Sequence, residues 1–383
     1  MEKLTKAMTD LIAGEVCKKA TDAEAFRALS EEELKELYKL SKKHDLAHII
    51  GNALIKSGVL TEGKVKAAFE KEIFTAVYRY ENINNELKEI RRVLGEAKIP
   101  FIPLKGSVIR EYYPEPWQRT SCDIDVLVKE EDLARATSSL VNALGYTAEE
   151  KKNYHDISLF SPSGIHLELH FNLKETIEKL DIVLVRAWDY AQEKENCEYE
   201  FDNEFLFFHL YAHASYHFIG GGCGIRPFID FYLLRKKLTA NEEKLGGLLD
   251  EAGIRFFAEK SDELANVWFG NGESDEITKE MEEFVLSGGV YGNPENHAAV
   301  KQAKKGKFGH LWSRIWIPYE SLIILYPSLK GKRVLQPFYE IRRWFKLFKK
   351  STLKRSVNEL KVNAEMSDET LSKTQKLLRD LKL

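Results

Sequence analysis

The stretch LKGSVIREYYPEPWQRTSCDIDVLV, residues 104–128, and the stretch HLELHFNL, residues 166–173, decide the fold. The end of the first stretch alternates acidic and apolar residues, which predicts a strand with Asp123 and Asp125 on one face. The second stretch alternates in the same way and carries a third carboxylate, Glu168. The sequence therefore predicts two strands that each show acidic residues on one face and an apolar core on the other.

A short apolar segment, IPFIPL, covers residues 99–104 and contains Pro100 and Pro103. Because proline has no backbone N–H to donate, this pattern predicts an edge strand rather than a central one. Helical spacing resumes directly afterwards, so Gly106 and Ser107 fall at a strand-to-helix turn. A turn of this kind lets the backbone approach a phosphate and points free N–H groups at it.

Two more strands and a helix complete the predicted core. KEEDLARATSSLVNALGY has amphipathic helical spacing and stops at Gly145, which suits a left-handed cap. Strands are predicted over 157–160 and 165–171. The sequence between them, Ser-Pro-Ser-Gly at 161–164, predicts a hairpin turn.

The chain as a whole is predicted to be an α+β protein, with a small mixed β-sheet core flanked by N-terminal and C-terminal helical regions. Apolar spacing predicts a helical N-terminal region over 1–95, before the core at 96–175. A helical region at 176–270 is expected to pack beside the core and complete a substrate cleft. Residues 271–383 predict a helical C-terminal region with a basic segment and a polar tail from about Asn363.

Composition narrows the classes of protein. The net charge of −3 argues against a surface that is wholly a nucleic-acid footprint, which makes a nucleic-acid partner unlikely. The cysteines form no CxxC pair, so neither a zinc knuckle nor a disulfide framework is indicated. The N-terminus lacks the apolar core of a signal peptide, and no apolar stretch is long enough to span a membrane. A soluble, cytoplasmic protein is expected, with four reduced cysteines: Cys17, Cys122, Cys197 and Cys223.

The three carboxylates suggest a metal site. Two aspartates on one strand face form a rigid pair of oxygen ligands, which Mg²⁺ prefers. With Glu168 on an adjacent strand, Asp123 and Asp125 could hold two ions about 4 Å apart that clamp the attacking and leaving oxygens of a phosphoryl transfer. Lys105 and Arg119 are candidates to neutralise the charge of a triphosphate.

The order of these features resembles the nucleotidyltransferase superfamily that includes DNA polymerase beta and the aminoglycoside nucleotidyltransferases. More narrowly, residues 104–128 with HLELHFNL resemble the bacterial uncharacterised nucleotidyltransferase family, whose members carry an LKG, an arginine before Asp-Ile-Asp and a later Glu-Leu-His. The resemblance covers residues 99–173 and extends weakly to Arg235 and to the stretch YPSLKGKRVLQPFYEIRRW, residues 326–344. The sequence departs from the superfamily in a longer gap between Gly106 and Asp123.

This resemblance implies a Mg²⁺-dependent reaction, with two ions expected. An acceptor hydroxyl or phosphate, on a small molecule or a protein, would attack the α-phosphate of a nucleoside triphosphate and release pyrophosphate. The family's frequent genomic surroundings favour a sugar-like acceptor. His166 or His170 would lie beside the third acid, which often helps to activate the acceptor. By residue, the metal-binding and catalytic acids would be Asp123, Asp125 and Glu168, and the phosphate contacts Gly106 and Ser107.

Several side chains carry two interpretations. Arg119 could instead be a surface arginine paired with Glu115. Three histidines recur every four residues on one predicted helix, which suggests either a metal site or a packed, cleft-lining set. Of these, His213 is the one to examine if the helix bounds the cleft. The other two are His209 and His217.

Two other patterns are interpreted mainly as structural. Asp230 follows Arg226 by four residues, which predicts an intrahelical pair. The segment 330–355 has ten basic residues and one acidic residue with aromatic residues between them. It could pack on its own domain, or it could make a peripheral contact with an anionic membrane or bind a nucleic acid.

Two other functions remain open. A catalytically silent nucleotide-binding module could keep the fold and lose turnover. A partner-binding module, either antitoxin-like or attached to a surface, could use the same fold.

Overall fold

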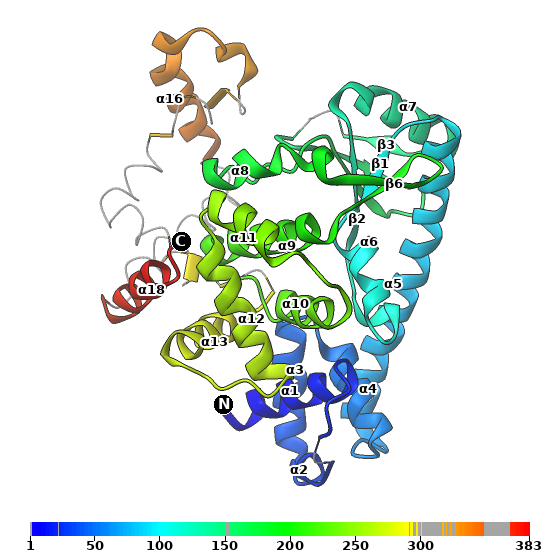
Figure 1. The fold of residues 1–383 in the computed structure, drawn as a ribbon, viewed down its shortest axis with the longest axis vertical. Coiled ribbons are helices and arrows are strands. Elements are labelled where there is room, and N and C mark those ends of the chain that lie inside the picture. Colours follow the sequence, from blue (N-terminus) through cyan, green and yellow to red (C-terminus); the bar gives the residue numbers. More distant parts are fainter. Residues whose placement is uncertain are drawn as a thin grey trace.

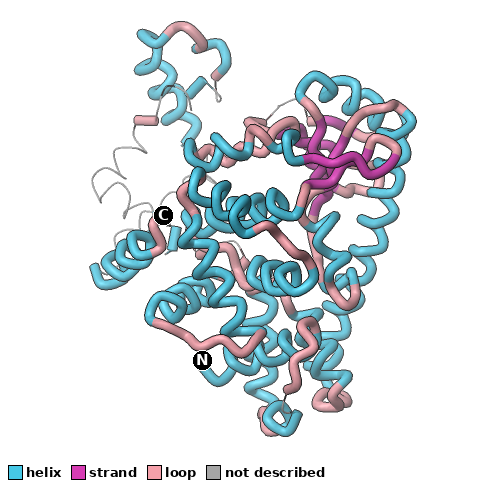
Figure 2. The backbone as a smooth tube through the Cα atoms, viewed as in Figure 1, coloured by secondary structure: helices cyan, strands magenta, loops and turns pink. Residues whose placement is uncertain are grey.

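The computed structural model of the chain combines one mixed sheet with many helices, which confirms the predicted α+β class (Figure 1 and Figure 2). The sheet lies at one end of the molecule, and the helices within residues 2–56 lie at the other (Figure 1). The structure describes residues 2–21, 23–149, 153–290, 292–293, 296–297, 300, 316–317, 319, 322–323, 326–347 and 368–383.

Seven strands form the sheet in the order β3-β4-β5-β2-β1-β7-β6. The pairs β2–β5 and β1–β7 are parallel, and the other neighbours are antiparallel. β2 is the central strand, with β5 on one side and β1 on the other. The strands are β1 (Phe101–Pro103), β2 (Asp123–Val128), β3 (Thr147–Ala148), β4 (Asp156–Phe160), β5 (His166–His170), β6 (Ala191–Glu195) and β7 (Glu198–Phe201).

The prediction that residues 99–104 form an edge strand is wrong. β1 lies between β2 and β7, and the edge is taken by the β6–β7 hairpin. β7 pairs with β1 only at Phe101, whose N–H donates to the Cys197 carbonyl at 3.0 Å. The missing N–H of Pro103 therefore breaks no bond to β7.

Helices surround the sheet and build the rest of the molecule. Before β1 they are α1 (Glu2–Glu15), α2 (Ala23–Arg27), α3 (Glu31–Lys43), α4 (Ala47–Lys56) and α5 (Gly63–Glu96). Within and after the sheet they are α6 (Gly106–Ile109), α7 (Leu133–Leu144), α8 (Glu178–Leu184), α9 (Asn203–Gly220), α10 (Arg226–Lys237), α11 (Glu242–Glu251), α12 (Arg255–Phe269) and α13 (Glu276–Gly288). Near the C-terminus they are α16 (Gln336–Leu347) and α18 (Asp368–Asp380).

Two turn predictions are confirmed. Gly145 ends α7 in the left-handed conformation, with φ 72° and ψ 24°. The turn at 161–164 joins the antiparallel strands β4 and β5, and Gly164 has a φ of 85° that a residue with a side chain would rarely adopt. Both glycines therefore act where the sequence predicted a change of chain direction.

Apolar packing fixes which way the acidic face of the sheet points. One face of β2 and β5, with Ile124, Val126 and Leu167, packs in a core shared with α5 and α7. A larger core on the other side joins the N-terminal helices to α9–α13. The acidic residues of β2 and β5 alternate with those buried in the first core, so they turn toward the α9 side.

The polar tail predicted from about Asn363 contains a helix in the part that the structure describes. α18 occupies 368–380 and packs Leu377 and Leu378 into the larger core, while residues 363–367 lie outside the described residues. Lys376 bonds Glu276 and Glu280 of α13 at 2.6 and 2.7 Å. A short apolar stripe in an otherwise polar segment is enough to dock the helix.

Candidate active site

The register of the two central strands brings the acidic residues together. β2 and β5 run in parallel, with Asp125 directly opposite Glu168 and Asp123 opposite His166. Paired residues on one face of a sheet have adjacent side chains, so the three carboxylates share one small region. The flanking leucines and isoleucines are buried, which prevents the strands from slipping by one residue.

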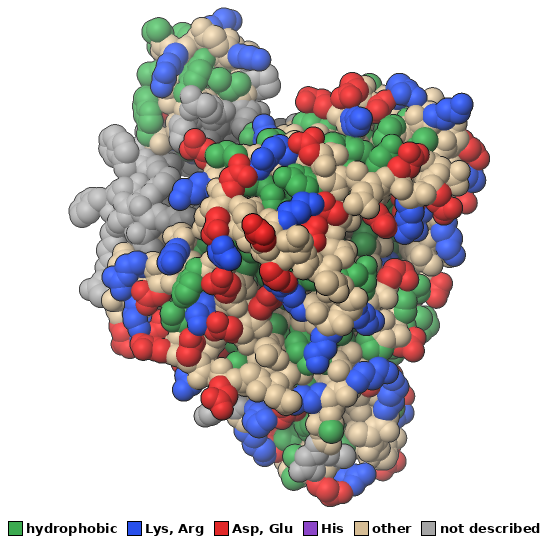
Figure 3. Space-filling view, in the orientation of Figure 1, with side chains coloured by type: hydrophobic (Ala, Val, Ile, Leu, Met, Phe, Trp, Pro, Cys, Tyr) green, Lys and Arg blue, Asp and Glu red, His purple; other side chains and the backbone are tan. Residues whose placement is uncertain are grey.

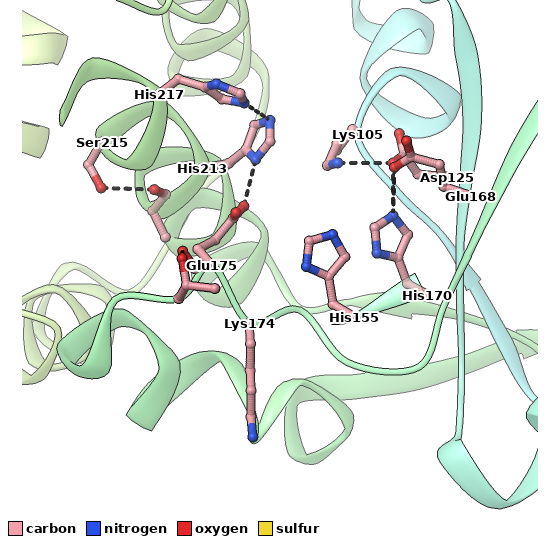
Figure 4. Close-up of polar contacts among 12 residues, drawn as sticks. Lys105, Asp125, His155, Glu168, His170, Lys174, Glu175, His213, Ser215 and His217 are labelled. Atoms are coloured by element: carbon pink, nitrogen blue, oxygen red, sulfur yellow. Dashed lines mark hydrogen bonds and ion pairs between the residues drawn. The ribbon is translucent and has the colours of Figure 1, made fainter. Parts of the chain in front are cut away.

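Asp125 is the most enclosed of the three acids, and two groups donate to it (Figure 4). Lys105 Nζ lies 2.9 Å from Oδ1, and His170 Nε2 lies 3.0 Å from the same oxygen. His170 Nε2 is also 3.4 Å from Glu168 Oε2. Among the described residues no hydrogen bond falls on Asp125 Oδ2, which leaves that oxygen available to a cation.

The charged groups of the site shift one another's pKa values. Burial would raise the pKa of Asp125, but the Lys105 ammonium and the His170 imidazole bring that pKa well below its usual range. The hydrogen bond from His170 lowers the pKa of Glu168. Burial, and then the charges of Asp125 and Glu168, raise the pKa of Asp123. The site thus holds more negative charge than Lys105 and His170 compensate.

Lys105 is held over Asp125 by an unusual backbone. It has φ 45° and ψ −118°, and the Ser107 N–H donates to the Leu104 carbonyl at 3.0 Å. These are the features of a type II′ turn with lysine at the position that glycine usually occupies. Strain of this kind persists where the surroundings fix it, and here it directs the ammonium toward Asp125.

The predicted strand-to-helix turn is present after β1, with Gly106 as the first residue of α6. α6 has only four residues before the chain tightens into a 3-10 turn. A Cβ on Gly106 would lie 3.1 Å from the Ser121 Cβ, so this glycine is needed for packing against the segment before β2. The Ser107 hydroxyl is buried and has no partner among the described residues. Arg110 fastens the turn by donating to the Gly106 carbonyl at 2.6 Å and to Ser121 Oγ at 2.9 Å.

Arg119 is a half-buried residue, with a side chain that is 12% exposed, rather than a surface arginine paired with Glu115. Its Nε and Nη2 each lie 2.9 Å from one oxygen of Asp230, and the Tyr113 hydroxyl donates to the same carboxylate at 2.7 Å. The predicted pair between Arg226 and Asp230 is therefore also wrong. The guanidinium of Arg119 binds both oxygens of the Asp230 carboxylate, which makes it the stronger partner. Arg226 pairs instead with Asp45.

A cavity of about 380 Å³ opens over this site. Ser107 is not among the residues that line it, and His166 lies beside Asp123 and Glu168 without lining the cavity. The predicted residues that do line it are Lys105, Gly106, Arg119, Asp123, Asp125, Glu168, His170 and His213.

The cavity has further polar residues that the sequence did not single out for the site. Glu175 Oε1 lies 2.8 Å from His213 Nδ1, and His155 stacks on His170 with ring centroids 5.3 Å apart. The histidines of α9 had a signal in their four-residue spacing, and all three line the cavity. Glu175 had none, because a glutamate after a strand is usually a solvated loop residue.

The donor atoms fit a bound cation. Two groups of three ligands each have all their donor atoms within 4.8 Å of one another, and they share Glu168. His166 Nε2 is buried and has no hydrogen-bond partner among the described residues, which suits a coordinating atom. The histidines of α9 belong to no such group in the described part of the chain. The two groups are Asp123, His166 and Glu168, and Asp125, Glu168 and His170.

Comparison with protein families assigns the chain to a family. Residues 30–270 match the family described as uncharacterised nucleotidyltransferase, and the match covers more than half of the chain. The chain therefore belongs to this family, and the prediction of a nucleotidyltransferase enzyme is confirmed. The matched residues include every residue that lines the cavity except Val290.

Searches of the curated proteins and of the solved structures found no match. Among the described residues, none of the helices has the length and apolar character that crossing a bilayer requires.

Proposed function

We propose that the protein transfers a nucleoside monophosphate from a nucleoside triphosphate to an acceptor, by the Mg²⁺-dependent chemistry of the polymerase-beta-type superfamily. The observation that carries this proposal is the pairing of Asp125 with Glu168, with Asp123 beside them, under a cavity large enough for substrate. Membership of a nucleotidyltransferase family supports the same reaction class. The expected compartment is the cytoplasm.

The three carboxylates would hold the metal, with two Mg²⁺ ions expected. Bound there, the ions would supply charge stabilisation to the reacting phosphate. His170 would keep Asp125 and Glu168 oriented, since a group that donates to metal ligands fixes their position. Asp123, Asp125 and Glu168 are the proposed catalytic carboxylates, because they would hold the metal.

We propose that the residues of the turn after β1 contact the triphosphate. Lys105 and Gly106 both line the cavity, and Lys105 contacts Asp125, so they are well placed to meet a triphosphate bound at the metal site. Ser107 would contribute only after its hydroxyl turns toward the cavity. Arg119 would act mainly by holding the segment before β2, because Asp230 occupies its fork.

Calorimetric titration of the four nucleoside triphosphates with Mg²⁺ tests the proposal. Wild type should bind at least one of them, and the Asp123→Asn variant or the omission of Mg²⁺ should weaken that binding by at least about tenfold. A matched control is Glu195→Gln, which changes an exposed carboxylate of β6 in the same sheet. No binding by folded wild type, or equal binding by Asp123→Asn, would contradict the proposal.

The alternative is a catalytically silent or antitoxin-like module. It predicts nucleotide binding, or partner binding, without consumption of the nucleotide. The complete set of carboxylates favours the enzyme, since a silent site has no need to keep three buried or half-buried acids together. Mg²⁺-dependent release of pyrophosphate separates the two.

We propose a second role, contact with an anionic membrane surface, for the described part of the basic segment. Val334, Phe338 and Ile341 are spaced by four and three residues and are 88%, 70% and 48% exposed. The only acidic residue there, Glu340, is buried and pairs with Arg343 at 2.7 Å. Figure 3 shows apolar and basic side chains side by side on this projecting part, at the upper left. Exposed apolar residues flanked by cations fit an anionic bilayer. Residues 348–355 lie outside the described residues.

Co-sedimentation with vesicles tests this second role. Wild type should bind phosphatidylglycerol vesicles and not phosphatidylcholine vesicles, and the double variant Phe338→Ser, Ile341→Ser should lose the binding. Phe74→Ser is the matched control, because Phe74 on α5 is also 70% exposed. This role would be overturned if the double variant still bound phosphatidylglycerol vesicles. It would also be overturned if wild type bound RNA and did not bind the vesicles.

A further inference from the structure

Three linked side chains face the carboxylate site from the other wall of the cavity (Figure 4). Glu175 Oε1 lies 2.8 Å from His213 Nδ1, and His213 Nε2 lies 3.2 Å from His217 Nε2. None of the three belongs to the groups that could hold a metal. They therefore form a separate polar unit within the same cavity.

Rigid elements hold this unit in place. His213 and His217 are one turn apart on α9, whose neighbouring residues are buried in the larger core. Glu175 lies between β5 and α8, and its backbone N–H donates to Asp181 Oδ1 at 2.7 Å. The Glu175 side chain is 12% exposed, so it faces the cavity rather than bulk water.

We propose that Glu175, His213 and His217 form a proton relay that receives the proton of the acceptor, and that the acceptor is therefore a hydroxyl compound rather than a phosphate. This inference rests on the nucleotidyl transfer proposed above. It adds the acceptor class and the residues that meet the acceptor.

Hydrogen-bond direction supports the choice of a hydroxyl. A neutral imidazole has one nitrogen that donates and one that accepts. When His213 donates from Nδ1 to the Glu175 carboxylate, its Nε2 must accept, and His217 donates from its own Nε2. His217 Nδ1 is then left with a free lone pair. A hydroxyl can donate to that lone pair, whereas the dianion of a phosphate monoester has no proton to donate.

The protonation states agree with this direction. Burial lowers the pKa of His213 and of His217 to about 3, so both are neutral near pH 7. Burial raises the pKa of Glu175, so it is the better final holder of a proton. The ionisable groups that act on the relay across the cavity are Lys105, Arg119, Asp125, His155 and His170.

The charges of the lining also disfavour a phosphate acceptor. Its cations are either paired with carboxylates or, for Lys174, turned away from the relay (Figure 4). The Glu175 carboxylate adds negative charge to this wall, which would repel a second phosphate. The paired cations are Lys105 with Asp125, Arg119 with Asp230 and Arg226 with Asp45.

The transfer balances with this relay. The acceptor oxygen forms a bond to the α-phosphorus while the bond from that phosphorus to the bridging oxygen breaks, and pyrophosphate leaves with the electron pair. The acceptor proton passes to His217 Nδ1, the His217 Nε2 proton to His213 Nε2, and the His213 Nδ1 proton to Glu175. Both histidines remain neutral with exchanged tautomers, and Glu175 becomes protonated.

The test uses the full chain with α-labelled nucleotide and Mg²⁺, with glycerol as the hydroxyl probe and phenyl phosphate as the anionic probe. Wild type should form nucleotidyl-glycerol and no nucleotidyl phenyl phosphate. Glu175→Gln still accepts the hydrogen bond from His213 but cannot take the proton. It should slow transfer by about 10²–10⁴-fold while the Kd for nucleotide changes by less than about threefold. Glu195→Gln, the same change at an exposed carboxylate of β6, should behave as wild type.

Transfer to phenyl phosphate in preference to glycerol, or an unchanged rate in Glu175→Gln, would overturn the relay. Absence of nucleotide binding in wild type would instead contradict the proposed function itself. If wild type binds nucleotide without transfer to glycerol, ¹⁵N spectra of the histidine rings decide the matter. The relay requires a proton on His213 Nδ1 and on His217 Nε2 at pH 7, and any other tautomer or a charged ring would overturn it.

Discussion

At the scale of single residues, the cavity is held by buried and half-buried charged groups that have defined partners. Arg119 joins the segment before β2 to Asp230 on α10, with a fork of two hydrogen bonds to its carboxylate. Breaking a buried pair from one side leaves an unpaired charge, which is costly. Arg119 therefore fixes the position of the strand that carries the aspartates.

Arg119→Met should lower the free energy of unfolding by about 3–5 kcal/mol, because Asp230 would keep a buried charge without its cation. Denaturant unfolding measures this difference. Arg92→Met is the control, since Arg92 pairs with Glu89 and Glu96 on an exposed face and should cost less than about 1 kcal/mol. If both variants lowered the free energy of unfolding by the same amount, the Arg119–Asp230 pair would stabilise the fold no more than an exposed ion pair does.

His48 makes stability depend on pH. Burial lowers its pKa from 6.5 to about 4, and its Nε2 lies 2.9 Å from the Gln118 carbonyl oxygen. The unfolded chain binds a proton on this group below pH 6.5 and the folded chain does not, so its stabilising contribution is lost as pH falls from 6.5 to 4. His48→Gln should reduce the pH slope of the unfolding free energy by up to about 1.4 kcal/mol per pH unit in that window. An unchanged slope would contradict the buried, neutral state of His48.

The sequence predicted the acids of the site more readily than their partners. Alternation along two short strands was enough to bring Asp123, Asp125 and Glu168 to one face, because strand periodicity is local information. The partner of Arg119 lies 111 residues away, and no local pattern identifies it. Glu175 was missed for the same reason, since its role depends on His213 of a later helix.

At the scale of elements, two short segments changed the expected architecture. The β6–β7 hairpin is rich in charged residues, and its turn uses Asn196 and Cys197 at φ 48° and 64° in place of the common Asn-Gly pair. It therefore lacked both the apolar alternation and the turn signal by which strands are recognised. Its addition to the sheet moved β1 from the edge to the interior.

α18 provides a test of the packing at the C-terminal end. Leu377→Ala should lower the free energy of unfolding by about 2–5 kcal/mol, because Leu377 is 3% exposed within the larger core. Lys373→Ala on the same helix is exposed and should change it by less than about 0.5 kcal/mol. A negligible effect of Leu377→Ala, measured by denaturant unfolding, would mean that α18 does not dock.

At the scale of the whole molecule, the cavity exists because the sheet and the helices after it share a continuous apolar core. The carboxylates come from β2 and β5, whereas the opposite wall comes from α9 and the start of α10. The N-terminal helices join the same core, and Asp45 from the end of α3 reaches the cavity. The site thus needs segments from most of the chain, although its acids lie within fifty residues.

Ligand binding should therefore stabilise the molecule as a whole. Mg²⁺ with the preferred nucleoside triphosphate, at one hundred times its Kd, should raise the free energy of unfolding by about 2.7 kcal/mol. Thermal unfolding with and without ligand measures this gain. Asp123→Asn should lose the gain while it keeps the unliganded midpoint, and a gain that survives this change would place the nucleotide elsewhere.

The most direct measurement of the central claim is the anomalous diffraction of Mn²⁺, as a substitute for Mg²⁺, in crystals grown with a non-hydrolysable nucleoside triphosphate. The structure predicts one or two Mn²⁺ peaks within about 2.0–2.3 Å of carboxylate oxygens of Asp123, Asp125 and Glu168, in contact with the triphosphate. Bound nucleotide without metal at these carboxylates, or metal at another place in the cavity, would contradict the claim.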